Sequence, residues 1–234
     1  MLAQQSSRSC SYQYVHSAVY LRGNQVTVEY YRPLGVGKYP LVLMLHGSSG
    51  VYSTDGESEP ATDNFGEKQL ARNCFAVALP HYMEALGLKS ILSVQEMSAR
   101  FSEMLSALQE ILTNAETLPW VDAQQVFLYG ESLGGFLGVA LAFERSEVLA
   151  ISEFSGGMPS GYKFPRHRRL RVLISHGRSD TIVPIAEAEK LAFFCRERGI
   201  YVQIYTFEGQ GHFLLPAARQ QTLNRTVRFF LRQR

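Results

Sequence analysis

The sequence has few cysteines, and their arrangement argues against two kinds of site. Cys10, Cys74 and Cys195 are odd in number and form no C-x-x-C pair, which speaks against a disulfide framework and against a zinc cluster. The histidines show no H-x-x-x-H spacing, the pattern that holds a metal on one helix face. We therefore expect reduced thiols and no metal.

Long hydrophobic runs and a strong charge bias are also absent. No apolar run reaches the roughly 18 residues that a transmembrane helix needs, and the polar opening MLAQQSSRSC lacks the apolar region of a signal peptide. The formal net charge of +2 creates no global field that would recruit nucleic acid or an anionic membrane. We expect a cytoplasmic enzyme without membrane association, although an exported chain whose signal had been removed would look the same.

Short apolar runs alternate with amphipathic segments along the chain. Its 234 residues, of which 46% are hydrophobic, can bury one full core. Continuous apolar runs suit strands that are buried on both faces. They lie at residues 41–45, 75–79, 126–129, 148–151 and 172–175. Helical patterns run from Val94 to Leu112 and from Pro184 to Gly199. This alternation predicts a mainly parallel sheet with right-handed crossovers.

The N-terminal part follows a different pattern. YQYVHSAVYL and QVTVEYYRP flank RGN and predict an antiparallel hairpin at one edge of the sheet, while YVQIYTF at 201–207 predicts a strand near the other edge. We expect a flexible N-terminal segment over residues 1–11 and a single α/β domain over residues 12–234. Ligands of such sheets bind outside the carboxyl ends of the strands, so functional residues should follow the strands.

Ser132 lies in a glycine-rich turn between a predicted strand and a predicted helix. Gly130-Glu131-Ser132-Leu133-Gly134 matches G-x-S-x-G in the context that a nucleophile elbow needs. The glycines avoid collisions at a sharp, strained turn. The helix N-terminus also places amides and a partial positive charge beside the hydroxyl. The alternative is a glycine-rich turn with an idle serine.

Two later loops supply the partners that a nucleophilic serine requires. Asp180 follows the strand that ends near Ser175, and His212 follows the next strand in a glycine-flanked loop. Acid and then base is the order expected after a G-x-S-x-G elbow. Asp180 could instead cap the helix that opens at Pro184, and Glu153, at the end of an earlier strand, is a rival acid. His212 could be an ordinary loop histidine.

Two backbone amides are predicted to hold the oxyanion of the reaction. One belongs to Leu133, directly after the serine at the helix start. The other follows the strand at 41–45, where the chain reads HGSSG and folds sharply at His46-Gly47. This turn would present the amide of Ser48 or Ser49.

Four motifs, in this order, resemble those of the dienelactone hydrolase branch of the α/β-hydrolase superfamily: LMLHGSSG, VDAQQVFLYGESLGG, HGRSDTIVP and GQGHFL. The resemblance runs roughly from Tyr12 to the end. It implies the α/β-hydrolase fold, Ser132, Asp180 and His212 as a catalytic triad, and hydrolysis of a carboxylic ester or related acyl bond. The dienelactone hydrolases themselves carry a cysteine nucleophile. Serine at position 132 therefore favours a general esterase within the branch.

The implied reaction is a two-step acyl transfer that needs no cofactor. His212 takes the proton of Ser132 during attack on a small-molecule ester, returns it to the leaving alcohol, and then activates water. A peptidase or acyltransferase related to prolyl oligopeptidases, or a thioesterase, would use the same triad, and a non-catalytic binding protein would tolerate its loss. We expect a monomer or homodimer. The basic run RHRRLR at 166–171 precedes a strand, away from the catalytic loops, so we interpret it as a solvated face and expect no nucleic-acid partner.

The substrate pocket is predicted from side chains that follow the strand ends. The candidates are Tyr52, His81, Tyr82, Phe154, Met158, Tyr162 and Phe213. No large cap domain is expected, because the short connection over 155–171 is rich in glycine and proline, which disfavour a helix. The polar, acidic segment 49–66 offers little apolar wall. Small or short-chain esters are the expected substrates.

Overall fold

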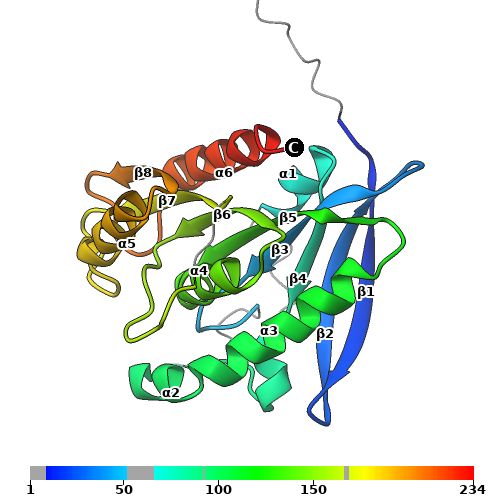
Figure 1. Ribbon diagram of the computed structural model, residues 1–234, viewed down its shortest axis with the longest axis horizontal. Helices are drawn as coiled ribbons and strands as arrows, with labels where there is room; N and C mark the ends of the chain where they lie inside the picture. The colour runs from blue at the N-terminus through cyan, green and yellow to red at the C-terminus, as the bar shows by residue number, and fades with distance from the viewer. Residues whose placement is uncertain (1–8, 52–65, 92, 166–168) are drawn as a thin grey trace, which may run out of the picture.

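One sheet runs through the molecule, with helices on both sides (Figure 1). The computed structural model describes residues 9–51, 66–91, 93–165 and 169–234. The strands are β1 (Tyr12–Leu21), β2 (Asn24–Pro33), β3 (Tyr39–Leu45), β4 (Ala76–Pro80), β5 (Val121–Glu131), β6 (Val148–Phe154), β7 (Arg171–Gly177) and β8 (Tyr201–Phe207). Their order in the sheet is β1-β2-β4-β3-β5-β6-β7-β8. β1 and β2 form an antiparallel hairpin and β2 is antiparallel to β4, whereas every later pair is parallel.

Helices cover the two faces of the sheet unequally. They are α1 (Glu67–Arg72), the 3-10 helix η1 (Tyr82–Leu86), α2 (Val94–Ala99), α3 (Phe101–Glu116), α4 (Leu133–Glu144), α5 (Ile185–Glu197) and α6 (Pro216–Leu231). The helices α3, α4 and α5 pack on one face, and α1 and α6 pack on the other. Within the described ranges, no helix combines the length and apolar character that a membrane crossing would require.

Strand β3 illustrates why the apolar runs are continuous. Leu41, Leu43 and Leu45 belong to the core beneath α3–α5, and Val42 and Met44 belong to the core beneath α1 and α6. Successive side chains of a strand point to opposite faces, so a strand covered on both sides needs an apolar residue at every position. The predicted α/β fold with a mainly parallel sheet, an N-terminal hairpin and an edge strand at 201–207 is confirmed.

The helical pattern that begins at Val94 is broken in the structure. It forms two helices, α2 and α3, which meet at Arg100 with φ −100° and ψ 4°. None of the residues of α2 is buried, whereas α3 buries one side along its whole length. Helices draw most of their stability from packing an apolar face, so α2 has little to hold it in line with α3.

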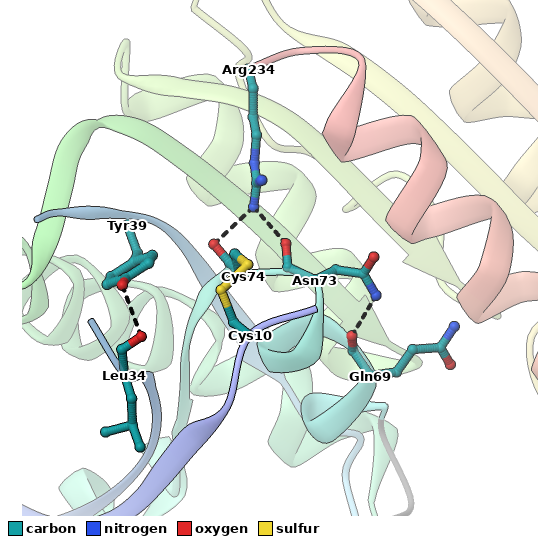
Figure 2. The surroundings of a disulfide bond; sticks show 7 residues. All are labelled: Cys10, Leu34, Tyr39, Gln69, Asn73, Cys74 and Arg234. Atoms are coloured by element: carbon teal, nitrogen blue, oxygen red, sulfur yellow. Dashed lines mark hydrogen bonds between the residues drawn. A yellow bond between two sulfur atoms is a disulfide. The ribbon is translucent and has the colours of Figure 1, made fainter. Parts of the chain in front are cut away.

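The expectation of three reduced thiols is wrong. Cys10 and Cys74 form a disulfide with a Cα–Cα distance of 5.2 Å, and only Cys195 remains free and buried (Figure 2). An odd cysteine count does not prevent one pair, because pairing depends on which segments the fold brings together. Of the predicted flexible segment 1–11, residues 1–8 lie outside the described residues. Cys10 is tied down, since its N–H also donates to the Arg72 carbonyl at 2.8 Å.

The other end of the chain reaches the same turn. The Arg234 guanidinium donates to the carbonyls of Asn73 and Cys74, both at 2.9 Å (Figure 2). It also lies 3.9 Å from the centre of the Phe75 ring. Both ends of the described chain are thus attached beside α1. Because one sheet holds all the strands of the described chain, we propose that residues 12–234 form one domain, with Cys10 as part of it.

Candidate active site

Ser132 lies between β5 and α4 in a backbone conformation that residues with side chains rarely adopt, with φ 54° and ψ −119°. A Cβ at Gly130 would lie 2.3 Å from the Gly134 carbonyl oxygen, and one at Gly134 would lie 2.2 Å from the Leu45 carbonyl oxygen. Both distances are too short for any side chain. The two glycines therefore allow the sharp turn that holds the strained serine at the carboxyl end of the sheet.

Ser132, His212 and Asp180 form a continuous chain of hydrogen bonds. The Ser132 hydroxyl lies 3.0 Å from His212 Nε2, and His212 Nδ1 lies 2.8 Å from Asp180 Oδ2. The carboxylate can only accept, so Nδ1 carries the proton and Nε2 is free to accept from the serine. The Ser155 hydroxyl donates to the His212 carbonyl at 3.0 Å and helps to fix the loop that carries the histidine.

Asp180 accepts hydrogen bonds from three donors and lies close to a buried histidine. Oδ1 accepts from the backbone N–H groups of Ile182 and Val183, both at 2.9 Å. Oδ2 accepts from His212 Nδ1 and lies 3.2 Å from Nε2 of His176. A carboxylate whose two oxygens both accept from N–H groups of the surrounding loops has a fixed orientation. Asp180 is thus well placed to orient His212.

The rival acid, Glu153, has a very different environment. It is fully buried at the end of β6, where Oε2 accepts only from the Gly156 N–H at 2.9 Å and Oε1 has no partner among the described residues. Burial raises the pKa of Glu153 to about 8, against a smaller lowering by the Gly156 N–H. A carboxyl group that is protonated at neutral pH and does not touch His212 cannot serve as its acidic partner.

Sequence reasoning missed His176, which stands four residues before Asp180. Its ring is completely buried, and Nε2–H donates to the Val183 carbonyl at 2.8 Å as well as facing Asp180 Oδ2. Since both neighbours accept, Nε2 is the protonated nitrogen, and Nδ1 has no partner in the described part of the chain. The motif HGRSD contained the signal, namely a histidine four residues before the acid.

A second missed residue, Glu131, precedes the serine in the elbow. Its carboxylate is 8% exposed and accepts from Arg219 Nη2 of α6 at 3.2 Å. Burial raises the pKa of Glu131, while Arg219 and His212 act in the opposite direction. The only sequence signal is an acidic residue at the variable position of G-x-S-x-G.

The predicted oxyanion donors lie on two sides of Ser132. Leu133 is the first residue of α4, where helix geometry leaves the N–H without an intrahelical acceptor. On the other side, the Gly50 N–H donates to the Gly47 carbonyl at 3.1 Å and closes a turn over Ser48 and Ser49. A Cβ at Gly47 would lie only 3.3 Å from the Ser132 Cβ. The loop after β3 therefore borders the serine.

Three of the seven predicted pocket residues are buried in the structure, namely His81, Tyr82 and Phe154. Tyr52 lies outside the described residues. The ring of Tyr82 stacks on that of His46 at 4.1 Å and its hydroxyl donates to the His46 carbonyl, which braces the loop after β3. Burial lowers the pKa of His46 to about 4, so this ring is neutral.

The remaining three pocket candidates lie in different surroundings. Tyr162 donates to Glu144 at the far end of α4, about 18 Å along the helix from Ser132, so its hydroxyl lies far from the serine. Met158 is half-buried against the main core. Phe213 is 72% exposed, and its ring meets that of His212 edge to face at 5.1 Å. Among the described residues, no three His, Cys, Asp or Glu side chains form a metal-binding group.

The sequence around these residues matches that of a known protein family. The model of the phospholipase/carboxylesterase family matches residues 79–225, a span that includes all three hydrogen-bonded residues. The "Putative carboxymethylenebutenolidase" of Synechocystis is 24% identical over 191 residues, 77% of each chain. The "Probable inactive carboxylesterase" of Oryza sativa is 28% identical over 130 residues, 52% of this chain and 53% of its own.

Solved structures share the fold at low sequence identity. A dienelactone hydrolase-like promiscuous phosphotriesterase from metagenomic libraries matches with a TM-score of 0.74 and 16% identity, covering 96% of this chain and 99% of that one. A "putative dipeptidyl aminopeptidase IV" from Bacteroides ovatus matches with a TM-score of 0.72 and 12% identity, covering 95% of this chain but 36% of that one. The chain therefore belongs to the phospholipase/carboxylesterase family, and its fold is that of the dienelactone hydrolase-like structure.

Proposed function

We propose that the protein is a serine hydrolase that cleaves small or short-chain carboxylic esters. The observation that carries the proposal is the uninterrupted hydrogen-bond chain from the Ser132 hydroxyl through His212 to Asp180. The identity of the nucleophile as serine, rather than cysteine, favours a general esterase over a dienelactone hydrolase. No step of the proposed reaction requires a cofactor.

In the proposed reaction, Ser132 Oγ attacks the ester carbonyl while its proton passes to His212 Nε2. Asp180 accepts from Nδ1 and stabilises the imidazolium that forms. The amides of Leu133 and of Ser48 or Ser49 stabilise the oxyanion. His212 then protonates the leaving alcohol, and the acyl group stays on Ser132 until water, deprotonated by the same nitrogen, releases the acid.

The surroundings of the serine support a small substrate. The described parts of the connection between β6 and β7 contain no helix, so they supply no cap over the site. Two exposed apolar side chains, Ile182 and Phe213, lie in the loops that carry Asp180 and His212. They offer a short apolar rim rather than a deep groove, which suits an acyl group of a few carbons.

Relatives with other activities define the alternatives. The peptidase from Bacteroides ovatus shares the fold, but this chain covers only 36% of it, so an amide substrate is the second choice, with a thioester as another. The rice relative is named as inactive. Because Ser132, His212 and Asp180 are all present and hydrogen-bonded, we propose an active enzyme, working as a monomer or homodimer.

The disulfide bears on where the enzyme works. Disulfides such as Cys10–Cys74 persist in oxidising compartments and are rare in the cytosol of mesophiles, where thiols are kept reduced. Between the two locations compatible with the sequence, we therefore favour export over the cytoplasm.

A fluorophosphonate probe tests the proposal directly. We expect it to label Ser132 and to abolish hydrolysis of p-nitrophenyl acetate, and we expect Ser132→Ala to lose both labelling and turnover. Ser93→Ala, which alters the exposed cap of α2, is the matched control and should behave like the wild type. Turnover near the wild-type rate in Ser132→Ala would overturn the assignment, whereas labelling with cleavage of an amide but not of esters would favour the peptidase.

A further inference from the structure

A hollow of about 540 Å³ lies at the end of the sheet opposite the triad. It is bordered by Leu149, Arg171 and Tyr201, which stand at the amino ends of β6, β7 and β8, and by the residues that follow α6. The hydrogen-bonded serine, histidine and aspartate all follow the carboxyl ends of strands. A seven-residue strand is about 23 Å long, so this hollow is separate from the proposed active site.

The wall of the hollow is positively charged. Four of its nine described lining residues are arginine, namely Arg169, Arg171, Arg232 and Arg234, and none is acidic. Even if the α-carboxylate of Arg234 is counted, three positive charges remain in excess. Neither Arg171 nor Arg232 forms an ion pair within the described ranges. Positive charge gathered in a concave wall attracts anions.

Two of the four arginines, Arg171 and Arg234, are oriented by their neighbours. The Arg171 guanidinium lies 5.2 Å from the centre of the Tyr201 ring, which restricts its plane. Arg234 is fixed by its hydrogen bonds to the Asn73 and Cys74 carbonyls, so it shapes the wall more than it contributes a free donor. A guanidinium held in place loses less entropy when it binds a ligand, and its planar fork matches two oxygens of a phosphate group.

From this arrangement we infer that the hollow is a binding site for a small phosphate-bearing anion, such as a phosphomonoester or a diphosphate. Its volume lies within the range of about 300–1,000 Å³ that is usual for small-molecule sites. The site explains why basic residues of the run RHRRLR stand at this position, since Arg169 and Arg171 both line the hollow. The inference is independent of the proposed esterase activity.

Calorimetric titration with sodium pyrophosphate, at an ionic strength matched by sodium chloride, tests the site. We expect saturable binding to the wild type and at least about tenfold weaker binding to Arg171→Gln/Arg232→Gln, because each lost charge-assisted hydrogen bond weakens binding by that order. Arg22→Gln/Arg100→Gln removes the same charge from distant surface pairs and should bind as the wild type does. Inorganic phosphate should bind more weakly than pyrophosphate.

Three results would overturn the inference. They are an absence of binding beyond the chloride control, equal binding by the Arg171→Gln/Arg232→Gln variant, and binding of single-stranded DNA through the same arginines without binding of pyrophosphate. The last result would identify a nucleic-acid surface instead. Hydrolysis of p-nitrophenyl acetate should be unchanged in every variant, and melting temperatures close to that of the wild type establish that the variants are folded.

Discussion

Asp180 and Glu153 are two buried carboxyl groups near the same end of the sheet, yet only one suits the role of an acidic partner to histidine. Asp180 is surrounded by donors and contacts His212, whereas Glu153 accepts a single backbone hydrogen bond. Both are acidic residues at or just beyond the carboxyl end of a strand. The number of donors around each carboxyl group decides between them.

Replacement of the two acids should therefore have unequal effects. Asp180→Asn should reduce kcat by about 10⁴-fold, the effect of losing the carboxylate that fixes the histidine tautomer in serine proteases, while Glu153→Gln should reduce it far less. Steady-state kinetics on p-nitrophenyl acetate, with circular dichroism to check folding, measure both. If the effects are reversed, the acid comes from β6.

The raised pKa of Glu153 should instead affect how the free energy of unfolding changes with pH. Its pKa is about 8 in the folded protein and about 4.3 when unfolded, so between these values the folded state keeps a proton that the unfolded state has lost. The contribution of Glu153 to stability then falls as pH rises through this window. Urea unfolding should show Glu153→Gln gaining stability relative to the wild type between pH 5 and pH 8. If the difference in stability between Glu153→Gln and the wild type is the same at every pH in this range, Glu153 is not protonated in the folded protein.

His176 is predicted to position Asp180. His176→Phe removes the hydrogen bond to the Val183 carbonyl and the imidazole 3.2 Å from Asp180 Oδ2. Because the Val183 N–H holds Asp180, kcat should fall by about 10-fold with little change in KM. His176→Gln keeps a donor near the same place and should recover part of the loss. If the two variants have equal melting temperatures, the difference in kcat between them reflects the position of Asp180 and not a loss of stability. A His176→Phe enzyme with the wild-type kcat would exclude the role.

At the scale of the elements, the connection between β6 and β7 limits the substrate. It carries the chain directly from Phe154 to Arg171, and its described parts contain no helix. An α/β-hydrolase that binds long acyl chains needs an apolar wall to cover them. The exposed Ile182 and Phe213 provide apolar surface for a few carbons only.

The value of kcat/KM should therefore be highest for esters with short acyl chains. Each buried methylene adds about 0.8 kcal/mol where an apolar groove exists, and this gain should end after a few carbons. Across p-nitrophenyl esters, kcat/KM should peak between acetate and butyrate and decrease by octanoate. A monotonic rise through palmitate would show that a lipid groove is present.

For the whole molecule, the Cys10–Cys74 disulfide links the start of the first strand to the turn after α1. It closes a loop with a sequence separation of 64 residues. Arg234 reaches the same turn from the C-terminal end, so three distant parts of the chain meet there. A covalent link across such a loop lowers the conformational entropy of the unfolded chain, so unfolding becomes less favourable.

Reduction should destabilise the protein measurably. The loop length corresponds to about 4 kcal/mol in the chain-entropy model, so dithiothreitol should lower the urea midpoint of the wild type to that of Cys10→Ser. The Cys10→Ser variant should be insensitive to dithiothreitol, which serves as the control. If reduction leaves the wild-type midpoint unchanged, the disulfide contributes nothing to stability.

The sequence by itself determined the features that depend on local order along the chain. Continuous apolar runs specified the buried strands, and Gly130 and Gly134 specified the turn around Ser132. The order of Ser132, Asp180 and His212 after successive strands indicated that the parallel sheet would bring them to one edge, and they lie within hydrogen-bond distance. These inferences succeeded because strand periodicity and turn sterics act over a few residues.

Only the tertiary structure decided the contacts between segments far apart in the sequence. Three features depend on which strands are neighbours: the pairing of Cys10 with Cys74, the approach of His176 to Asp180, and the burial of Tyr82 and Phe154. A residue at a strand end points either to the surface or into the core, and sequence position alone does not distinguish the two. Packing around each side chain makes that choice, because the interior is filled by whichever segments the sheet order brings together.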